Sequence, residues 1–405
     1  MFKRAAFAFS FLLCTVAMGA DEPQWLKDAR ARESETLKAA EITSKDGWFK
    51  VRTPGKQVGS VEKMEGSYSV ELDVGGDATV LCEVYPDGID LAHALRQTLL
   101  NSLANIESSQ GKIEVRALEG SDAGAYGAVP YMSLAWLYRV AAEDGLRVGA
   151  LKQVVMEKNG MGIYCAHNDL GYTQTFATIA RAFAESLESQ EPARNPHYVE
   201  IATATMSGMK IGVAVSTLER DADGDIKALQ VTSMLVPTQD GAVMSQDATH
   251  LYWLHPNGDV INAVKSEVSN GEVSHDLALK FDEGLWTVTG EVQGKAVHTT
   301  LPKDSQPGNW MTQAKQLREL MNQPDPIGRE HSIGIWLAEN PEKLTVAKTK
   351  ILSKQDDRSF VARSDLGGIN ADLTLDKSNG MASTIDIKVG AISIRMSRVF
   401  ASGTF

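Results

Sequence analysis

The chain has 405 residues and a formal net charge of −12, because 40 lysines and arginines oppose 52 aspartates and glutamates. This acidic balance argues against nucleic acid or an anionic membrane as a partner, since both require a basic surface. A hydrophobic fraction of 43% and a charged fraction of 23% are typical of a globular protein, and the length suits two or three domains.

The first twenty residues have the three zones of a cleaved secretory signal peptide. Two basic residues precede an apolar run from Ala5 to Met18, and small residues follow it. The run is short for a membrane span, which needs about 20 apolar residues. We therefore predict cleavage after Gly19 or Ala20, a periplasmic or secreted location, and no membrane span in the mature chain.

Two cysteines remain in the expected mature chain, Cys82 and Cys165, because signal cleavage removes Cys14. Each alternates with apolar neighbours, as on a half-buried strand. In an oxidising compartment the two are a candidate disulfide. The alternative is two separate buried thiols, since a bond requires Cα atoms within about 7 Å of each other.

The first half of the chain has the pattern of an α+β domain. We predict a charged surface helix over Gln24–Ala40, and an alternation of period two predicts strands from Gly47 onward. A helix is expected over Leu91–Ile106, with Asp90 as its N-cap. A three-stranded meander and another helix should follow. The meander strands are Met132–Val140, Leu146–Val155 and Gly160–His167, and the helix is Thr173–Leu187.

A family resemblance rests on three segments of this half: Lys45–Pro54, the helix that follows Cys82–Pro86, and the closing strand and helix of Gly160–Leu187. Over residues 43–190 this pattern resembles the PsbP-like fold, shared by photosystem II accessory proteins and bacterial DcrB-like envelope proteins. The resemblance implies an antiparallel sheet with helices on its faces, and a binding or assembly role without chemistry.

The second half reads as strands separated by turns about ten residues apart, which predicts a larger antiparallel β domain. One helix interrupts it, Met311–Met321, with Asn309 as its N-cap. The half is similar to the large antiparallel sheets of LolA-like lipoprotein carriers and to β-rich segments of some secreted transglutaminase-like proteins. The predicted organisation is a signal peptide at 1–20, an N-terminal helix at 21–42, a PsbP-like α+β domain at 43–190, a linker at 191–197 and the β-rich domain at 198–405.

Two groups of residues have the composition of a chemical site without its spacing. Cys165, His167 and Asp169 alternate along one segment, but each step on a strand is about 6.5–7 Å, and a nucleophile must contact its base at about 3 Å. The acidic residues from Asp221 to Asp225 resemble a calcium loop whose glycine comes too early and whose closing glutamate is replaced by Thr232. A disulfide or buried cysteine and a hairpin turn are the better interpretations.

Histidines of the second half offer the remaining polar candidates. His250 and His255 would face opposite sides of one strand, so a shared metal is not expected. His275 and His298 could approach them only if the strand register allowed it. We therefore predict no catalytic residue, no cofactor and no metal site.

Tryptophans of the second half are candidate ligand-lining residues. Trp253, Trp286 and Trp336 lie in or beside strand segments and could line an apolar cavity for a lipid or peptide. Packing in a core is the alternative. The leading hypothesis is a non-catalytic periplasmic binding or envelope accessory protein, whose partner is an envelope protein or an apolar ligand. The alternatives are an exported hydrolase-like enzyme that uses the histidines, and an immunity or inhibitor protein against a secreted toxin.

Overall fold

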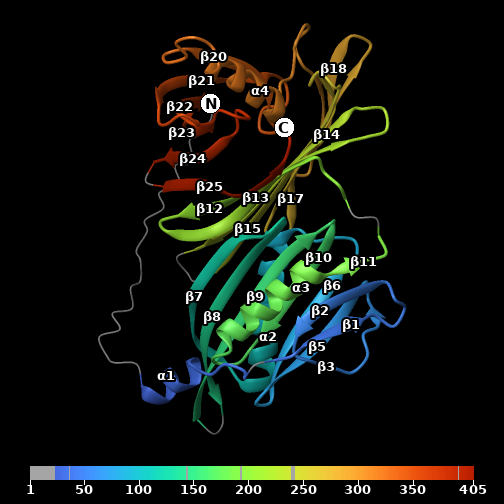
Figure 1. Cartoon of the computed structure of the whole chain (residues 1–405), viewed down its shortest axis with the longest axis vertical. Helices are drawn as coiled ribbons and strands as arrows, with labels where there is room; N and C mark the ends of the chain where they lie inside the picture. Colours follow the sequence, from blue (N-terminus) through green and yellow to red (C-terminus); the bar gives the residue numbers. More distant parts are fainter. Residues whose placement is uncertain (1–22, 36, 143–144, 192–193, 239–241, 391) are drawn as a thin grey trace.

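The computed structural model describes residues 23–35, 37–142, 145–191, 194–238, 242–390 and 392–405 (Figure 1). The predicted signal peptide lies outside the described residues. Among the helices of the described ranges, none has the length and apolar character needed to cross a membrane.

The first half of the chain forms two antiparallel sheets and two long helices, α2 (Leu91–Gln110) and α3 (Thr173–Ser186). In Figure 1, α3 lies in front of the larger sheet and α2 behind it. The strands are β1 (Ala39–Thr43), β2 (Phe49–Pro54), β3 (Lys56–Val58), β4 (Lys63–Met64), β5 (Ser67–Gly75), β6 (Ala78–Tyr85), β7 (Ile113–Tyr126), β8 (Val129–Ala142), β9 (Gly145–Lys158), β10 (Met161–His167) and β11 (Glu188–Ser189). The larger sheet has the order β3-β5-β6-β10-β9-β8-β7, with β4 beside β5, and the smaller one has the order β1-β2-β11.

The α+β class and the predicted meander are confirmed. Strands β8, β9 and β10 are neighbours joined by antiparallel pairing. Strand β8 alternates between more and less buried residues, whereas β9 and β10 are buried on both faces along most of their length, so the turn residues that bound these strands carry part of the prediction. The three helices predicted from a 3.6-residue period are also present, with ends within a few residues of those expected.

The prediction of one helix over Gln24–Ala40 is wrong. Helix α1 spans only Gln24–Arg30, and the residues from Ala39 form strand β1. Ile42 of β1 pairs with Val51 and is only 1% exposed. Burial of this strand against the core outweighs the helical propensity of the charged segment before it.

The candidate disulfide is confirmed. Cys82 on β6 lies directly opposite Cys165 on β10, and the two sulfur atoms are bonded with a Cα–Cα distance of 4.1 Å. Both residues are fully buried in the core between the larger sheet and α3. The bond therefore fixes the pairing of two central strands that are 83 residues apart in the sequence.

The second half forms one fourteen-stranded antiparallel sheet with the short helix α4 (Trp310–Met321). Its strands are β12 (Tyr198–Met206), β13 (Met209–Arg220), β14 (Ile226–Pro237), β15 (Val243–Leu254), β16 (Val260–Ser269), β17 (Glu272–Asp282), β18 (Leu285–Val292), β19 (Lys295–Thr300), β20 (Glu330–Trp336), β21 (Leu344–Lys354), β22 (Ser359–Leu366), β23 (Ile369–Asp376), β24 (Ala382–Val389) and β25 (Ile392–Gly403). The two series β12–β19 and β20–β25 meet where β12 pairs with β25.

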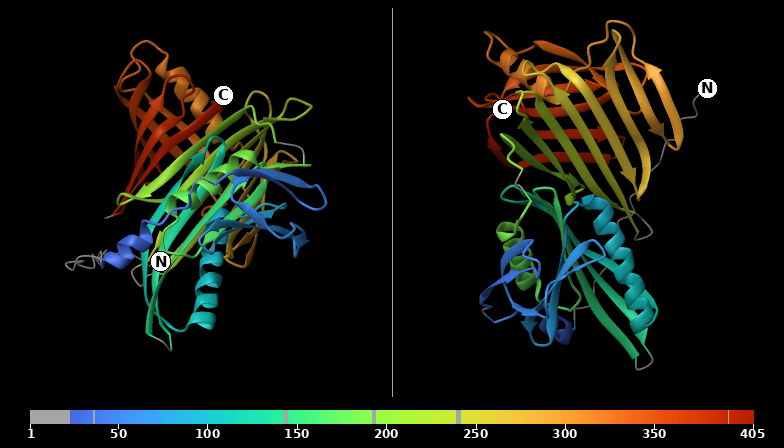
Figure 2. Two further views of the ribbon diagram at one scale, coloured as in Figure 1. Left: turned by 60° about the horizontal axis from the view of Figure 1, so that its bottom comes forward. Right: turned by 90° about the vertical axis from the view of Figure 1, so that its right-hand side faces the viewer.

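The large sheet bends into an open curve, and α4 lies between its two arms (Figure 2). Met311 packs in the same apolar cluster as residues of β15 and β16, whereas Leu317 and Met321 pack against β21, β22 and β23. Asn309 accepts a hydrogen bond from the Thr312 backbone N–H at 3.0 Å, which confirms the predicted N-cap.

The N-terminus of α2 contacts the large sheet, and this contact joins the two halves. Asp247 on β15 accepts hydrogen bonds from the backbone N–H groups of Ala92 and His93 at 3.0 and 2.8 Å, and from the hydroxyl of Ser233 at 2.6 Å. Asp90 occupies the predicted N-cap position of α2, but its side chain makes no capping hydrogen bond. A carboxylate supplied from the other half satisfies the free N–H groups of this helix end instead.

Replacement of Asp247 by alanine should therefore destabilise the protein by about 2 kcal/mol, because the helix loses its cap and Ser233 loses its buried partner. Urea unfolding followed by circular dichroism measures the change. The matched control is Asp90→Ala, for which we expect a change within about 0.5 kcal/mol. Equal effects of the two substitutions would contradict the capping role of Asp247.

Candidate functional site

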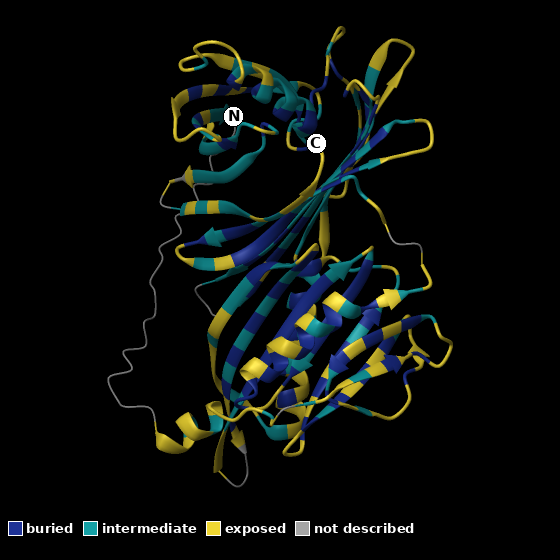
Figure 3. Ribbon diagram, in the orientation of Figure 1, coloured by how far each residue is buried: buried dark blue, intermediate teal, exposed yellow. Residues whose placement is uncertain are grey.

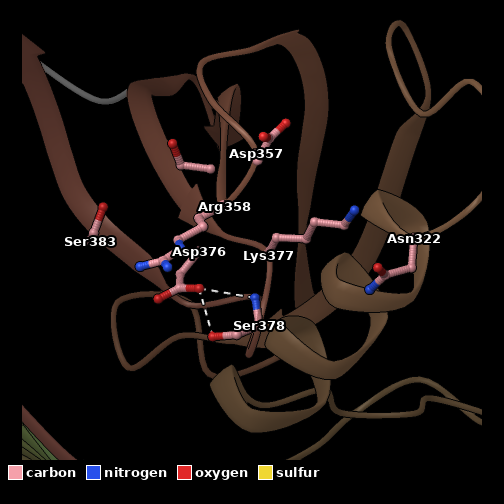
Figure 4. A pocket seen from close by; sticks show the side chains of 8 residues that line it. Asn322, Asp357, Arg358, Asp376, Lys377, Ser378 and Ser383 are labelled. Atoms are coloured by element: carbon pink, nitrogen blue, oxygen red, sulfur yellow. Dashed lines mark hydrogen bonds between the residues drawn. The ribbon is translucent and has the colours of Figure 1, made fainter.

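One depression, of about 760 Å³, lies beside the end of α4, between the turns that precede β22 and follow β23 (Figure 4). Asp376 accepts hydrogen bonds from the backbone N–H and hydroxyl of Ser378 at 2.9 and 2.7 Å, and from Arg398 Nη1 at 3.0 Å. Asn322, Asp357 and Arg358 on its rim are exposed. These hydrogen bonds of Asp376 stabilise a turn. This structural role explains the polar residues of the depression without a bound ligand.

The three candidate tryptophans do not line one cavity. Trp286 lines a depression of about 520 Å³ together with Phe281, which is 57% exposed. Trp336 is fully buried in the core of the large sheet, where it packs with the cluster that includes Tyr252. Trp253 follows Tyr252 on β15 and therefore faces the other side of the sheet.

Another depression, which we call the α2 groove, lies between α2 and the face of the larger N-terminal sheet that α3 does not cover, and has a volume of about 670 Å³. Helix α2 packs on β8 and β9, so β5 and β6 are left open on this face. Two rows of paired residues cross it. The first row is Val58, Glu71, Leu81, Ala166 and Gln153, and the second is Ser69, Glu83 and Tyr164.

A stripe of uncharged polar side chains on α2 forms one wall of the groove. Thr98, Asn101, Ser102, Asn105 and Ser109 all line it. Their spacing of three and four residues places them on one side of the helix. The buried leucines of α2 lie on the adjacent side and hold the helix against the sheet. The same helix therefore serves both the core and the groove.

A buried polar network lies at the base of the groove. The amide nitrogen of Gln153 contacts the Tyr164 hydroxyl at 2.6 Å and Ser102 Oγ at 3.3 Å, and the last two residues line the groove. Gln153 is fully buried, and its Oε1 has no hydrogen-bond partner among the described residues. The buried amide therefore holds in place two side chains, those of Tyr164 and Ser102, that line the groove.

The groove carries negative charge. Its lining includes the carboxylates of Glu71 and Glu83 and contains no lysine or arginine. The Tyr85 hydroxyl donates a hydrogen bond to Glu83, and burial together with this bond raises the pKa of Tyr85, which keeps the phenol neutral. Burial also lowers the pKa of His167 at one end, so its imidazole is uncharged near pH 7. The arrangement suits a cationic or neutral polar ligand.

The polar candidates of the sequence are not brought together as a chemical site. Cys165 is bonded to Cys82 and is not a free nucleophile. Asp221 accepts the N–H groups of Asp223 and Asp225, which is the pattern of a hairpin turn between β13 and β14. No group of three or more metal-ligating side chains occurs within the described ranges.

The histidines of the second half lie apart. His250 is directly opposite Lys265 on the neighbouring strand, and burial, with Lys265 nearby, lowers its pKa to about 3. His255 follows β15 at the surface, and His298 is exposed on β19. Lys265 is itself buried, its ammonium donates to the Trp336 carbonyl at 2.5 Å, and burial lowers its pKa to about 8.

Comparison with known proteins finds only weak structural similarity. No family model and no curated protein matches the sequence. A beta-barrel-like protein of the domain of unknown function DUF1849 from Brucella abortus is 13% identical, with 51% of this chain and 98% of that chain covered and a TM-score of 0.41. A DUF1089 family protein from Pseudomonas aeruginosa is also 13% identical, with 48% and 92% covered and a TM-score of 0.24. A Bacteroides thetaiotaomicron protein is 11% identical, with 41% and 52% covered and a TM-score of 0.24. Scores this low carry no argument about function.

Proposed function

We propose that this protein is a non-catalytic binding protein that acts after export, in the periplasm, and that it binds its partner in the α2 groove. The observation that supports this most is the polar stripe of α2, which lies beside an open sheet face that carries Glu71 and Glu83. Such a set of fixed hydrogen-bonding groups around a concave surface is characteristic of ligand sites.

Two further observations favour this proposal over an exported hydrolase. His250, His255 and His298 lie on separate parts of the large sheet, so they cannot act as one acid–base pair. The disulfide between Cys82 and Cys165 suits an oxidising compartment such as the periplasm. The groove is also more polar than the apolar cavity expected around the tryptophans, which favours a polar partner over a lipid.

Native mass spectrometry of protein purified from the periplasm tests the proposal. We expect the wild-type protein to carry a bound partner, and the substitution Asn105→Arg, which places a cation in the groove, to lose at least about 90% of it. Ser108→Arg is the matched control, because Ser108 is exposed on α2 outside the groove lining. Wild-type protein that is consistently bare, or equal loss in both variants, would rule out the groove as the binding site.

A further inference from the structure

A second depression adjoins the α2 groove and extends it toward the sheet edge. It has a volume of about 410 Å³, lies on β3, β4 and β5, and shares Glu71 with the α2 groove. Val58 and Met64 line it and are 44% and 69% exposed. The row from Val58 to Ala166 crosses four strands, which at about 4.8 Å per strand spans roughly 14 Å. This length suits a short extended peptide segment.

Acidic and apolar side chains alternate along this surface. In the first row, Glu71 lies between Val58 and Leu81, and Leu81 is 37% exposed. Glu83 lies one row further along the same face, diagonal to Glu71. Within the described residues Glu71 and Glu83 form no ion pair, so exposed apolar side chains next to them complement a partner that carries both apolar and basic groups.

We infer that the α2 groove and its adjoining depression bind a basic, amphipathic segment of another exported protein. This inference rests on the proposed function and names the partner class for the same site. Ammonium or guanidinium groups of the segment pair with Glu71 and Glu83, and its apolar side chains cover Val58, Met64 and Leu81. About four residues of extended chain span the row from Val58 to Ala166. A second copy of this chain is disfavoured as the partner, because its net charge of −12 repels the acidic surface.

Fluorescence anisotropy with a labelled Lys-Leu octapeptide tests the inference on the full chain purified from the periplasm. We expect the wild-type protein to bind this peptide and to bind a Glu-Leu octapeptide at least tenfold more weakly. The double variant Glu71→Gln/Glu83→Gln should lose about tenfold in affinity and Met64→Ser about threefold. Glu272→Gln, an exposed acidic residue of the other half, is the control and should bind like wild type.

Equal binding of the two peptides, or unchanged affinity in the double variant, would overturn the inference. It would also be overturned if spermidine displaced the peptide and Met64→Ser had no effect. That third result would define a site for small cations instead. Thermal unfolding of each variant shows whether it is folded. Suppose that native mass spectrometry finds a partner that is lost in Asn105→Arg, but that the peptide does not bind. That result would keep the proposed function and contradict only this inference.

Discussion

Replacement of Cys82 and Cys165 together by alanine is expected to lower the free energy of unfolding by about 2–5 kcal/mol. The bond closes a loop of 83 residues, so its loss gives the unfolded chain a large increase in conformational freedom. Both positions are fully buried within an apolar cluster, and alanine leaves no unpaired polar group there. Urea unfolding of the oxidised wild type and of the variant measures the difference.

Reduction provides the control for this expectation. Dithiothreitol should destabilise the wild-type protein by a similar amount and leave the double-alanine variant unchanged. Alkylation followed by mass spectrometry should find Cys82 and Cys165 without free thiols in the purified, unreduced protein. Two free thiols in that protein, or a variant as stable as wild type, would show that the bond does not form or does not support the fold.

Truncation of Trp336 to alanine is expected to destabilise the protein by about 3–5 kcal/mol. The side chain is fully buried, and its backbone carbonyl accepts the hydrogen bond of the buried Lys265 ammonium. Lys265 also lies 5.5 Å from the centre of the indole ring, so the substitution removes a cation–π contact as well as apolar packing. Thermal and urea unfolding measure the loss.

The control for Trp336 is Trp25→Ala, because Trp25 is 56% exposed on α1. We expect this change to stay within about 0.5 kcal/mol. The comparison also separates the two interpretations of Trp336. A ligand-lining residue would lose binding with little change in stability, whereas a core residue loses stability first.

The sequence predicts the elements of this fold well where local pattern determines them. Helices α2, α3 and α4 follow from apolar periodicity, and the meander of β8, β9 and β10 follows from apolar segments together with the turn residues between them. In Figure 3, buried and exposed residues alternate along strands such as β5 and β6, whereas the central strands β9 and β10 are buried along most of their length. The sequence leaves open whether Cys82 and Cys165 form a disulfide or stay separate thiols, because the bond depends on the register of strands that are distant in the sequence.

The helix caps and the α2 groove depend on long-range contacts, which the sequence does not reveal. The N-terminus of α3 is capped by Glu33, whose carboxylate accepts the N–H groups of Gln174 and Thr175, and α2 is capped by Asp247. These partners are separated by 141 to 155 residues, so no local signal marks them. The α2 groove was missed for the same reason. Its polar stripe is visible in the helix sequence, but the acidic strands opposite it are not. The resemblances to PsbP-like and LolA-like proteins stay predictions.

The position of β25 in the middle of the large sheet has a consequence for the order of folding. Strand β25 pairs with both β12 and β24, so it connects the two series of strands. In a chain that is synthesised from its N-terminus, β25 becomes available after β12 and β24. Until it arrives, β12 and β24 each present an unpaired edge, which is a site for aggregation. Folding should therefore depend on rapid completion of the chain, or on a chaperone that shields these edges, more than folding of a sheet built from successive hairpins does.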